Sequence, residues 1–199
     1  MLNSAKVRKN AANYLTWPLA QLLAKTSITP NYVTWFGFLL AVGAAVLVVT
    51  GHLLAAGILV LIGGFFDMLD GALARFTGQT TRFGAVLDST LDRLAEAALL
   101  LGILVVYASN QLVAESLLVG LALIGSFTVS YLRARIEALG IECKVGLFTR
   151  AERVIVLALG LLLSQFDYAL IVALAIIVLF SFITAGQRLF YAWCHTKSE

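Results

Sequence analysis

No charged residue occurs between Lys25 and Asp67, and this uncharged run is long enough for two transmembrane helices. The rest of the chain is similar, since 61% of its residues are hydrophobic and only 13% are charged. Soluble domains carry about 25% charged residues, so the composition indicates an integral membrane protein. The 199 residues suit one bundle of about six spans. We therefore predict an all-α integral membrane protein with six transmembrane helices.

Apolar segments separated by turn residues or polar stretches define the predicted spans. They cover residues 31–50, 53–75, 84–107, 112–137, 150–163 and a last segment from about 168 past 188. Residues 1–27 interleave basic and large apolar side chains, which is typical of an amphipathic helix in the cytoplasmic membrane interface. A frayed polar terminus is the alternative. The predicted organisation is a juxtamembrane helix at 1–27 and one membrane domain at 28–199.

The distribution of basic residues predicts the orientation of the spans. The three short outer loops, at 51–52, 107–115 and 164–168, contain no Lys or Arg. All fourteen basic residues fall in the segments on the other side. By the positive-inside rule that side is cytoplasmic, so we expect a multi-pass protein of the cell membrane. The stretch from Asp67 to Asp92 would then open to the cytosol.

That stretch is rich in carboxylates, and it holds four of the chain's eleven acidic residues: Asp67, Asp70, Asp88 and Asp92. Spacings of three and four place each pair on one face of a helix, and the short loop between the pairs makes the two helix ends neighbours. Four close carboxylates need a counter-charge, and an oxygen-only ligand set suits Mg²⁺, Mn²⁺ or Ca²⁺. Structural ion pairs with nearby arginines, or an ion pathway, are the alternatives.

The same stretch resembles the signature of the CDP-alcohol phosphatidyltransferase family, D-x-x-D-G-x-x-A-R followed by G-x-x-x-D-x-x-x-D. The matching residues are Asp67, Asp70, Gly71, Ala74, Arg75, Gly84, Asp88 and Asp92. The resemblance implies two divalent ions, Mg²⁺ or Mn²⁺, held by Asp67, Asp70 and Asp88 with help from Asp92. It also implies that Asp92 is the general base for the acceptor hydroxyl and that CMP is the leaving group.

Further residues are expected to bind the CDP-lipid if the resemblance holds. Asn31 and Thr34 match the family's P-N-x-x-T opening of the first span. Together with residues of the signature and its loop, the predicted set is Asn31, Thr34, Gly71, Ala74, Arg75, Thr81 and Gly84. The family also implies a homodimer, with membrane lipid and no nucleic acid among the partners. The donor would be CDP-diacylglycerol or CDP-archaeol.

The acceptor is predicted from two stretches, 82–93 and 130–153, which resemble the branch of the family that makes phosphatidylinositol phosphate or its archaeal counterpart. The second stretch collects cations near the cytosolic ends of two spans, and Arg188 could join them. A phosphorylated acceptor needs such cations. We predict that Arg133, Arg153 and Arg188 bind the acceptor phosphate, although relatives usually carry Lys at position 133. Ordinary positive-inside residues are the alternative for each.

The predicted function is transfer of a phosphatidyl group from CDP-diacylglycerol to inositol 1-phosphate. The closest alternative keeps this chemistry and uses glycerol 3-phosphate as the acceptor. A divalent-cation transporter is an alternative from another class, because it also needs intramembrane carboxylates. A transporter would, however, place acids deep within several spans, whereas the four aspartates gather in one short stretch.

Overall fold

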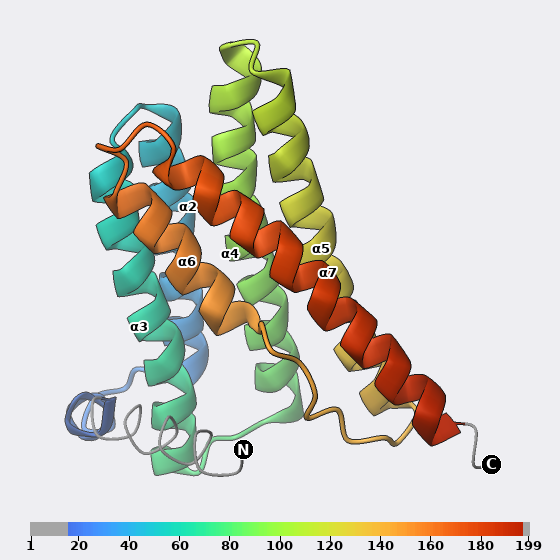
Figure 1. The fold of residues 1–199 in the computed structure, drawn as a ribbon. Helices are drawn as coiled ribbons and strands as arrows, with labels where there is room; N and C mark the ends of the chain where they lie inside the picture. Colours follow the sequence, from blue (N-terminus) through green and yellow to red (C-terminus); the bar gives the residue numbers. More distant parts are fainter. Residues whose placement is uncertain (1–15, 197–199) are drawn as a thin grey trace.

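The computed structural model describes residues 16–196 and contains no β-strand among them. A short helical segment at 16–23 is followed by six longer helices (Figure 1). These are α2 (Pro30–Val49), α3 (Leu53–Thr77), α4 (Arg82–Ser109), α5 (Val113–Ala138), α6 (Arg150–Leu162) and α7 (Ala169–Thr196). The all-α prediction is confirmed, and the helix bounds follow the predicted segments to within a few residues.

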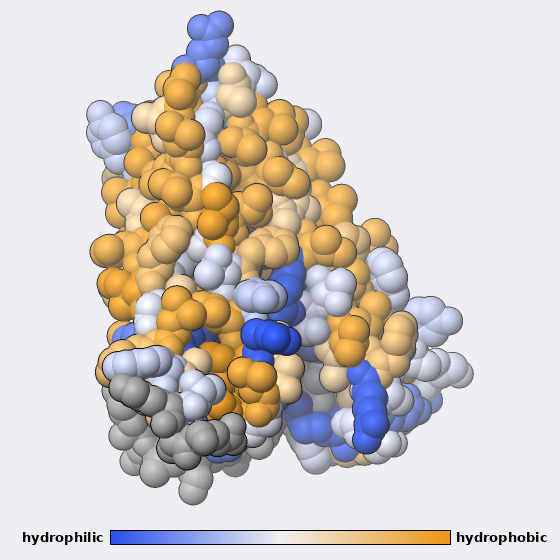
Figure 2. All heavy atoms as spheres, turned by 90° about the vertical axis from the view of Figure 1, so that its right-hand side faces the viewer, coloured by the Kyte–Doolittle hydropathy of each residue, from blue (hydrophilic) through white to orange (hydrophobic). Residues whose placement is uncertain are grey.

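Four of the helices, α2, α3, α5 and α7, are long and apolar enough to cross a membrane. Large apolar side chains also cover most of the upper part of the face in Figure 2, while hydrophilic residues gather toward its lower end. These features confirm a membrane protein. With 13 residues, α6 is only about 20 Å long, which is shorter than the hydrocarbon core of a bilayer. The count of six spans therefore stays a prediction.

Each helix runs opposite to the one before it, so the loops divide between two ends of the molecule (Figure 1). The loops at 50–52, 110–112 and 163–168 lie at the upper end. The connections at 78–81 and 139–149 lie at the lower end with the helical segment 16–23. The aspartate motif flanks the 78–81 loop, so it lies at the same lower end as the 139–149 connection, which carries Lys144.

The helices pack closely where small residues let their backbones approach one another. One group contains α2, α3 and α4, α5 pairs with α7, and α6 packs against both α3 and α7. At the α6–α7 crossing, a Cβ added to Gly160 would lie 2.6 Å from the Cβ of Ala173. The core between these helices is formed by Val60, Leu100, Leu161 and Leu174, among other apolar residues.

The helical segment 16–23 packs against α2 and α3 at the lower end of the molecule (Figure 1). Trp17 meets Phe76 edge-on with ring centroids 5.1 Å apart, and Ala20 is buried in a cluster with Leu69 and Leu73. The remainder of the predicted juxtamembrane helix, residues 1–15 with Lys6, Arg8 and Lys9, lies outside the described residues. Its placement in the membrane interface stays a prediction.

Candidate active site

Two neighbouring helix ends carry the predicted metal ligands. The loop between α3 and α4 is shorter than the predicted 76–83, because Thr77 still belongs to α3 and α4 already begins at Arg82. Gly78 ends α3 in the left-handed conformation with φ 67°, and the Thr81 hydroxyl accepts a hydrogen bond from the Gly84 amide at 2.9 Å. These two caps turn the chain back within four residues, which brings the aspartates of α3 and α4 together.

Three of the four aspartates form a compact cluster. One carboxylate oxygen from each of Asp67, Asp70 and Asp88 lies within 4.8 Å of the other two. Asp70 is only 5% exposed, and its Oδ2 is buried without a hydrogen-bond partner among the described residues. A buried carboxylate oxygen without a partner is costly. The oxygen-only donor set and this free oxygen fit a hard divalent cation.

Asp92 adjoins this cluster through Arg150, the first residue of α6. Nη1 of Arg150 lies 2.7 Å from Oδ2 of Asp67 and 2.5 Å from Oδ2 of Asp92, so one guanidinium joins α3, α4 and α6. Within residues 16–196 no ion pair joins the four aspartates to Arg75, Arg82 or Arg93. The predicted alternative of structural pairing with those arginines is therefore not what the structure shows.

The position of Arg150 is set by a capping box at the start of α6. The Thr149 amide donates to Oε2 of Glu152 at 2.8 Å, and the Thr149 hydroxyl also contacts that carboxylate. From the sequence, Arg150 was only one of several cytosolic cations. The T-R-A-E motif predicts a helix start and places an arginine on its first turn. The two aspartate partners could not be predicted from it.

A cavity of about 200 Å³ lies beside the cluster. Its lining includes every residue predicted to bind the CDP-lipid, namely Asn31, Thr34, Gly71, Ala74, Arg75, Thr81 and Gly84. Asp70 and Asp88 also line it, and so do Gln79 and Thr80, which sequence reasoning missed. These two belong to the α3–α4 loop, whose contribution is visible only once the loop is folded.

The glycines of the motif keep this cavity open. A Cβ added to Gly84 would lie 2.9 Å from Oγ1 of Thr81 and 3.4 Å from Oδ1 of Asn31. A Cβ added to Gly71 would lie 3.2 Å from Nη1 of Arg75. Any side chain at either position would therefore displace residues of the pocket or fill its space.

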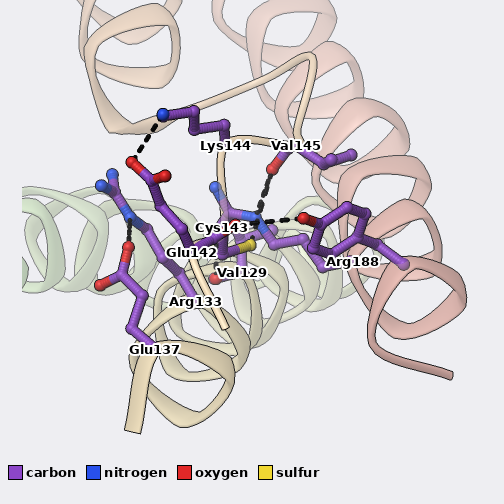
Figure 3. A network of polar contacts seen from close by, with 9 residues as sticks. Val129, Arg133, Glu137, Glu142, Cys143, Lys144, Val145 and Arg188 are labelled. Carbon is purple, nitrogen blue, oxygen red and sulfur yellow. Dashed lines mark hydrogen bonds and ion pairs between the residues drawn. The ribbon is translucent and has the colours of Figure 1, made fainter. Parts of the chain in front are cut away.

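The three arginines predicted to bind the acceptor phosphate come near one another, but each already has partners. Arg188 is within electrostatic range of both Arg133 and Arg153. Arg133 is exposed and donates from Nε to Oε1 of Glu137 at 2.9 Å. Arg188 is 3% exposed and donates to the backbone carbonyls of Val129 and Val145, which ties the α5–α6 connection to α7 (Figure 3).

Arg153 is the most deeply buried of the three, with 1% exposure. Its Nε and Nη2 donate to the two oxygens of Glu96 at 2.6 and 2.8 Å. Glu96 lies on α4, one turn beyond Asp92, and was not singled out from the sequence. An isolated glutamate within an apolar span is a signal in itself, because a charge at that depth requires a partner.

Residues 27–186 match the CDP-alcohol phosphatidyltransferase family. The match covers well over half of the chain. The chain belongs to this family.

Curated members of the family align with most of this chain. An archaetidylinositol phosphate synthase from Methanothermobacter thermautotrophicus is 40% identical over 90% of this chain and 89% of its own length. A phosphatidylinositol phosphate synthase from Mycobacteroides abscessus is 41% identical over 88% of this chain and 82% of its own. As a member of the same family, the present chain is a membrane-embedded transferase of phospholipid synthesis.

Solved structures of a family member from Mycobacterium tuberculosis resemble this fold. Its phosphatidylinositol phosphate synthase with CDP-diacylglycerol bound matches with a TM-score of 0.84 and 35% identity, covering 90% of this chain and 94% of that one. The same synthase in complex with manganese and citrate matches with a TM-score of 0.82 and 36% identity, covering 89% and 88%.

Proposed function

We propose that this chain transfers a phosphatidyl group from CDP-diacylglycerol to inositol 1-phosphate and releases CMP. One observation carries the proposal: Asp70 and Asp88 belong both to the carboxylate cluster and to the lining of the cavity with the predicted nucleotide residues. A pyrophosphate in that cavity would lie against the oxygen ligands of the cluster. Relatives named for inositol phosphate lipids support the acceptor. CDP-archaeol is the other donor that the relatives suggest.

Asp67, Asp70 and Asp88 would hold the metal in this proposal, with Asp92 beside them. Two divalent ions, Mg²⁺ or Mn²⁺, would neutralise the charge of the pyrophosphate when bound. The manganese complex of the M. tuberculosis relative supports this assignment. Around them, Asn31 and Thr34 from α2 and the small residues Gly71, Ala74 and Gly84 leave room for the cytidine nucleotide.

Asp92 accepts the proton of the acceptor hydroxyl. The hydroxyl oxygen forms a bond to the phosphorus that carries the lipid, and the bond from that phosphorus to the CMP oxygen breaks. Nη1 of Arg150 contacts the carboxylates of both Asp92 and Asp67. This shared contact fixes the distance between the proposed base, Asp92, and the proposed metal ligand, Asp67. A positioned general base contributes roughly 10²–10⁴-fold to such a step.

Arg133, Arg153 and Arg188 bind the phosphate of the acceptor in the same proposal. Arginine suits this role because its planar guanidinium donates in a fork that matches phosphate oxygens. The Arg188 side chain is anchored by backbone carbonyls, and Arg153 by Glu96, so both hold their positions before the acceptor arrives. Arg133, on the exposed face of α5, can exchange Glu137 for the ligand.

In this proposal the protein lies in the cell membrane and its site faces the cytosol. The helices α4 and α6 also cross the membrane, which makes six spans in all. Two copies of the chain form a homodimer. The connection with Lys144, the helix starts at Arg82 and Arg150, and the aspartate motif lie at one end of the molecule, while the loops at the other end carry no Lys or Arg (Figure 1). The cytosolic side also supplies water-soluble acceptors. Labelling of single cysteines placed in the loops 50–52 and 139–149 of intact cells would test this orientation.

The decisive test is CMP release by purified protein with CDP-diacylglycerol and Mg²⁺. Inositol 1-phosphate, free inositol and glycerol 3-phosphate are offered in separate reactions, and CDP-archaeol replaces the donor in a parallel series. Turnover with inositol 1-phosphate alone supports the proposal. Turnover with glycerol 3-phosphate alone overturns the acceptor assignment and leaves the chemistry standing. No CMP release from either donor with any acceptor would overturn the proposed reaction.

A further inference from the structure

Glu96 is a buried acid that lies outside the family signature. It is 8% exposed, and it lies on α4 one helical turn beyond Asp92. It also lines a small cavity of about 50 Å³ together with Asp92 and Arg150. The carboxylate is therefore next to the proposed reaction centre and is not simply enclosed by the apolar core.

The partner of Glu96 is Arg153, whose guanidinium is held by two hydrogen bonds along one of its edges. Nε and Nη2 of Arg153 donate to the two carboxylate oxygens, at 2.6 and 2.8 Å. An arginine has five N–H donors, and this pairing leaves both hydrogens of Nη1 free. Nη1 is buried and has no hydrogen-bond partner among the described residues. A buried donor without a partner is costly, and a phosphate oxygen would satisfy it.

Stability alone does not explain why the chain keeps this pair. Replacing a buried ion pair with well-packed apolar residues is often neutral or stabilising. The pair does, however, join α4 to α6, two helices that otherwise make little direct backbone contact. It therefore places a guanidinium from α6 at a set position relative to the base on α4. The neighbouring Arg150–Asp92 contact makes a parallel connection one turn earlier on both helices.

We propose that Glu96 is a positioning residue that orients Arg153 so that its free Nη1 edge receives the phosphate of the acceptor alcohol. The proposal rests on the proposed function. Without acceptor, Glu96 balances the buried charge of Arg153. With acceptor bound, the two fixed hydrogen bonds prevent the guanidinium from turning, so its remaining donors meet the phosphate without rearrangement. Specificity for a phosphorylated alcohol then depends on Glu96 as well as on the arginines.

Glu96→Asp tests orientation separately from charge. It keeps the carboxylate but withdraws it by one methylene group, which shifts Arg153. A displacement of about 1 Å in a positioned group can cost on the order of 100-fold, so we expect the KM for inositol 1-phosphate to rise about tenfold or more. The KM for CDP-diacylglycerol should stay within about twofold, because the nucleotide cavity is lined by other residues. Glu96→Gln should raise the acceptor KM at least as much.

Glu142→Asp is the matched control, because Glu142 forms an exposed ion pair with Lys144 and should leave both KM values unchanged. Lower thermal stability of Glu96→Asp with both KM values unchanged would make the pair merely structural and overturn the proposal. Tighter acceptor binding in Glu96→Gln would also overturn it, because Glu96 would then act only as a charge that opposes phosphate.

A second variant covers the case in which the single variants do not fold. Glu96→Met combined with Arg153→Met replaces the pair with apolar side chains and should fold, with a raised acceptor KM. An unchanged acceptor KM in this double variant would contradict the proposal. Failure of the proposed function is distinguishable, because wild-type protein would then release no CMP with inositol 1-phosphate, whatever residue stands at position 96.

Discussion

Replacing Arg150 with methionine removes the cation that joins Asp67 and Asp92 while keeping an unbranched side chain. A hydrogen bond to a charged group contributes about 1.5–3 kcal/mol, and Nη1 donates one to Asp67 and forms an ion pair with Asp92. Because the side chain is 25% exposed, solvent screening reduces the sum, and we expect a loss of about 2–3 kcal/mol in metal-free protein. At this chain length that corresponds to a melting temperature about 5–10 °C lower.

Addition of Mg²⁺ should reduce this difference. Without metal, Arg150 is the cation that contacts the aspartates of the site, so its loss leaves their negative charges uncompensated. With metal bound at Asp67, Asp70 and Asp88, the ions neutralise much of that charge themselves. Saturating Mg²⁺ should therefore raise the melting temperature of Arg150→Met more than that of the wild type.

The assay is thermal unfolding of detergent-solubilised protein, with and without Mg²⁺, at one fixed scan rate because unfolding of membrane proteins can be irreversible. Arg135→Met is the control, since Arg135 is exposed on α5 and has no ion pair among the described residues. Equal stabilisation by Mg²⁺ in wild type and Arg150→Met would show that Arg150 and the metal site are not coupled. An unchanged melting temperature of the metal-free variant would refute the stated energy.

Three further substitutions test other parts of the site and fold. Asp92→Asn should abolish CMP release while CDP-diacylglycerol still stabilises the protein in a thermal-shift titration; normal turnover would remove Asp92 from the base role. Gly84→Val should raise the KM for CDP-diacylglycerol about tenfold or more, because its Cβ would lie 2.9 Å from Oγ1 of Thr81, and an unchanged KM would place the nucleotide elsewhere. Gly160→Ala should destabilise by about 1–3 kcal/mol, since its Cβ would meet Ala173 at 2.6 Å. Gly120→Ala, with nothing within 4 Å, should be neutral or stabilising, and equal melting temperatures for the two would contradict the packing.

Local patterns in the sequence were enough to predict most of the helices. The apolar runs, the Thr29–Pro30 start and the Gly51 turn all act within a few residues, and the structure has helix ends at those positions. The loop at 78–81 was predicted too long, because the left-handed Gly78 and the Thr81 cap allow a tighter reversal than the polar residues around it suggest. The seven residues predicted to bind the CDP-lipid line one cavity, and that this cavity takes the nucleotide stays a prediction.

The sequence by itself determined the membrane class, the aspartate cluster and most of the residues that line the neighbouring cavity, because these depend on composition and on residues close together along α3, α4 and their short loop. Only the tertiary structure decided which acids the arginines meet. Arg150 reaches Asp67 across 83 residues, and Arg153 reaches Glu96 across 57. Such pairs depend on the rotation and tilt with which α6 packs against the bundle, and no local periodicity encodes them.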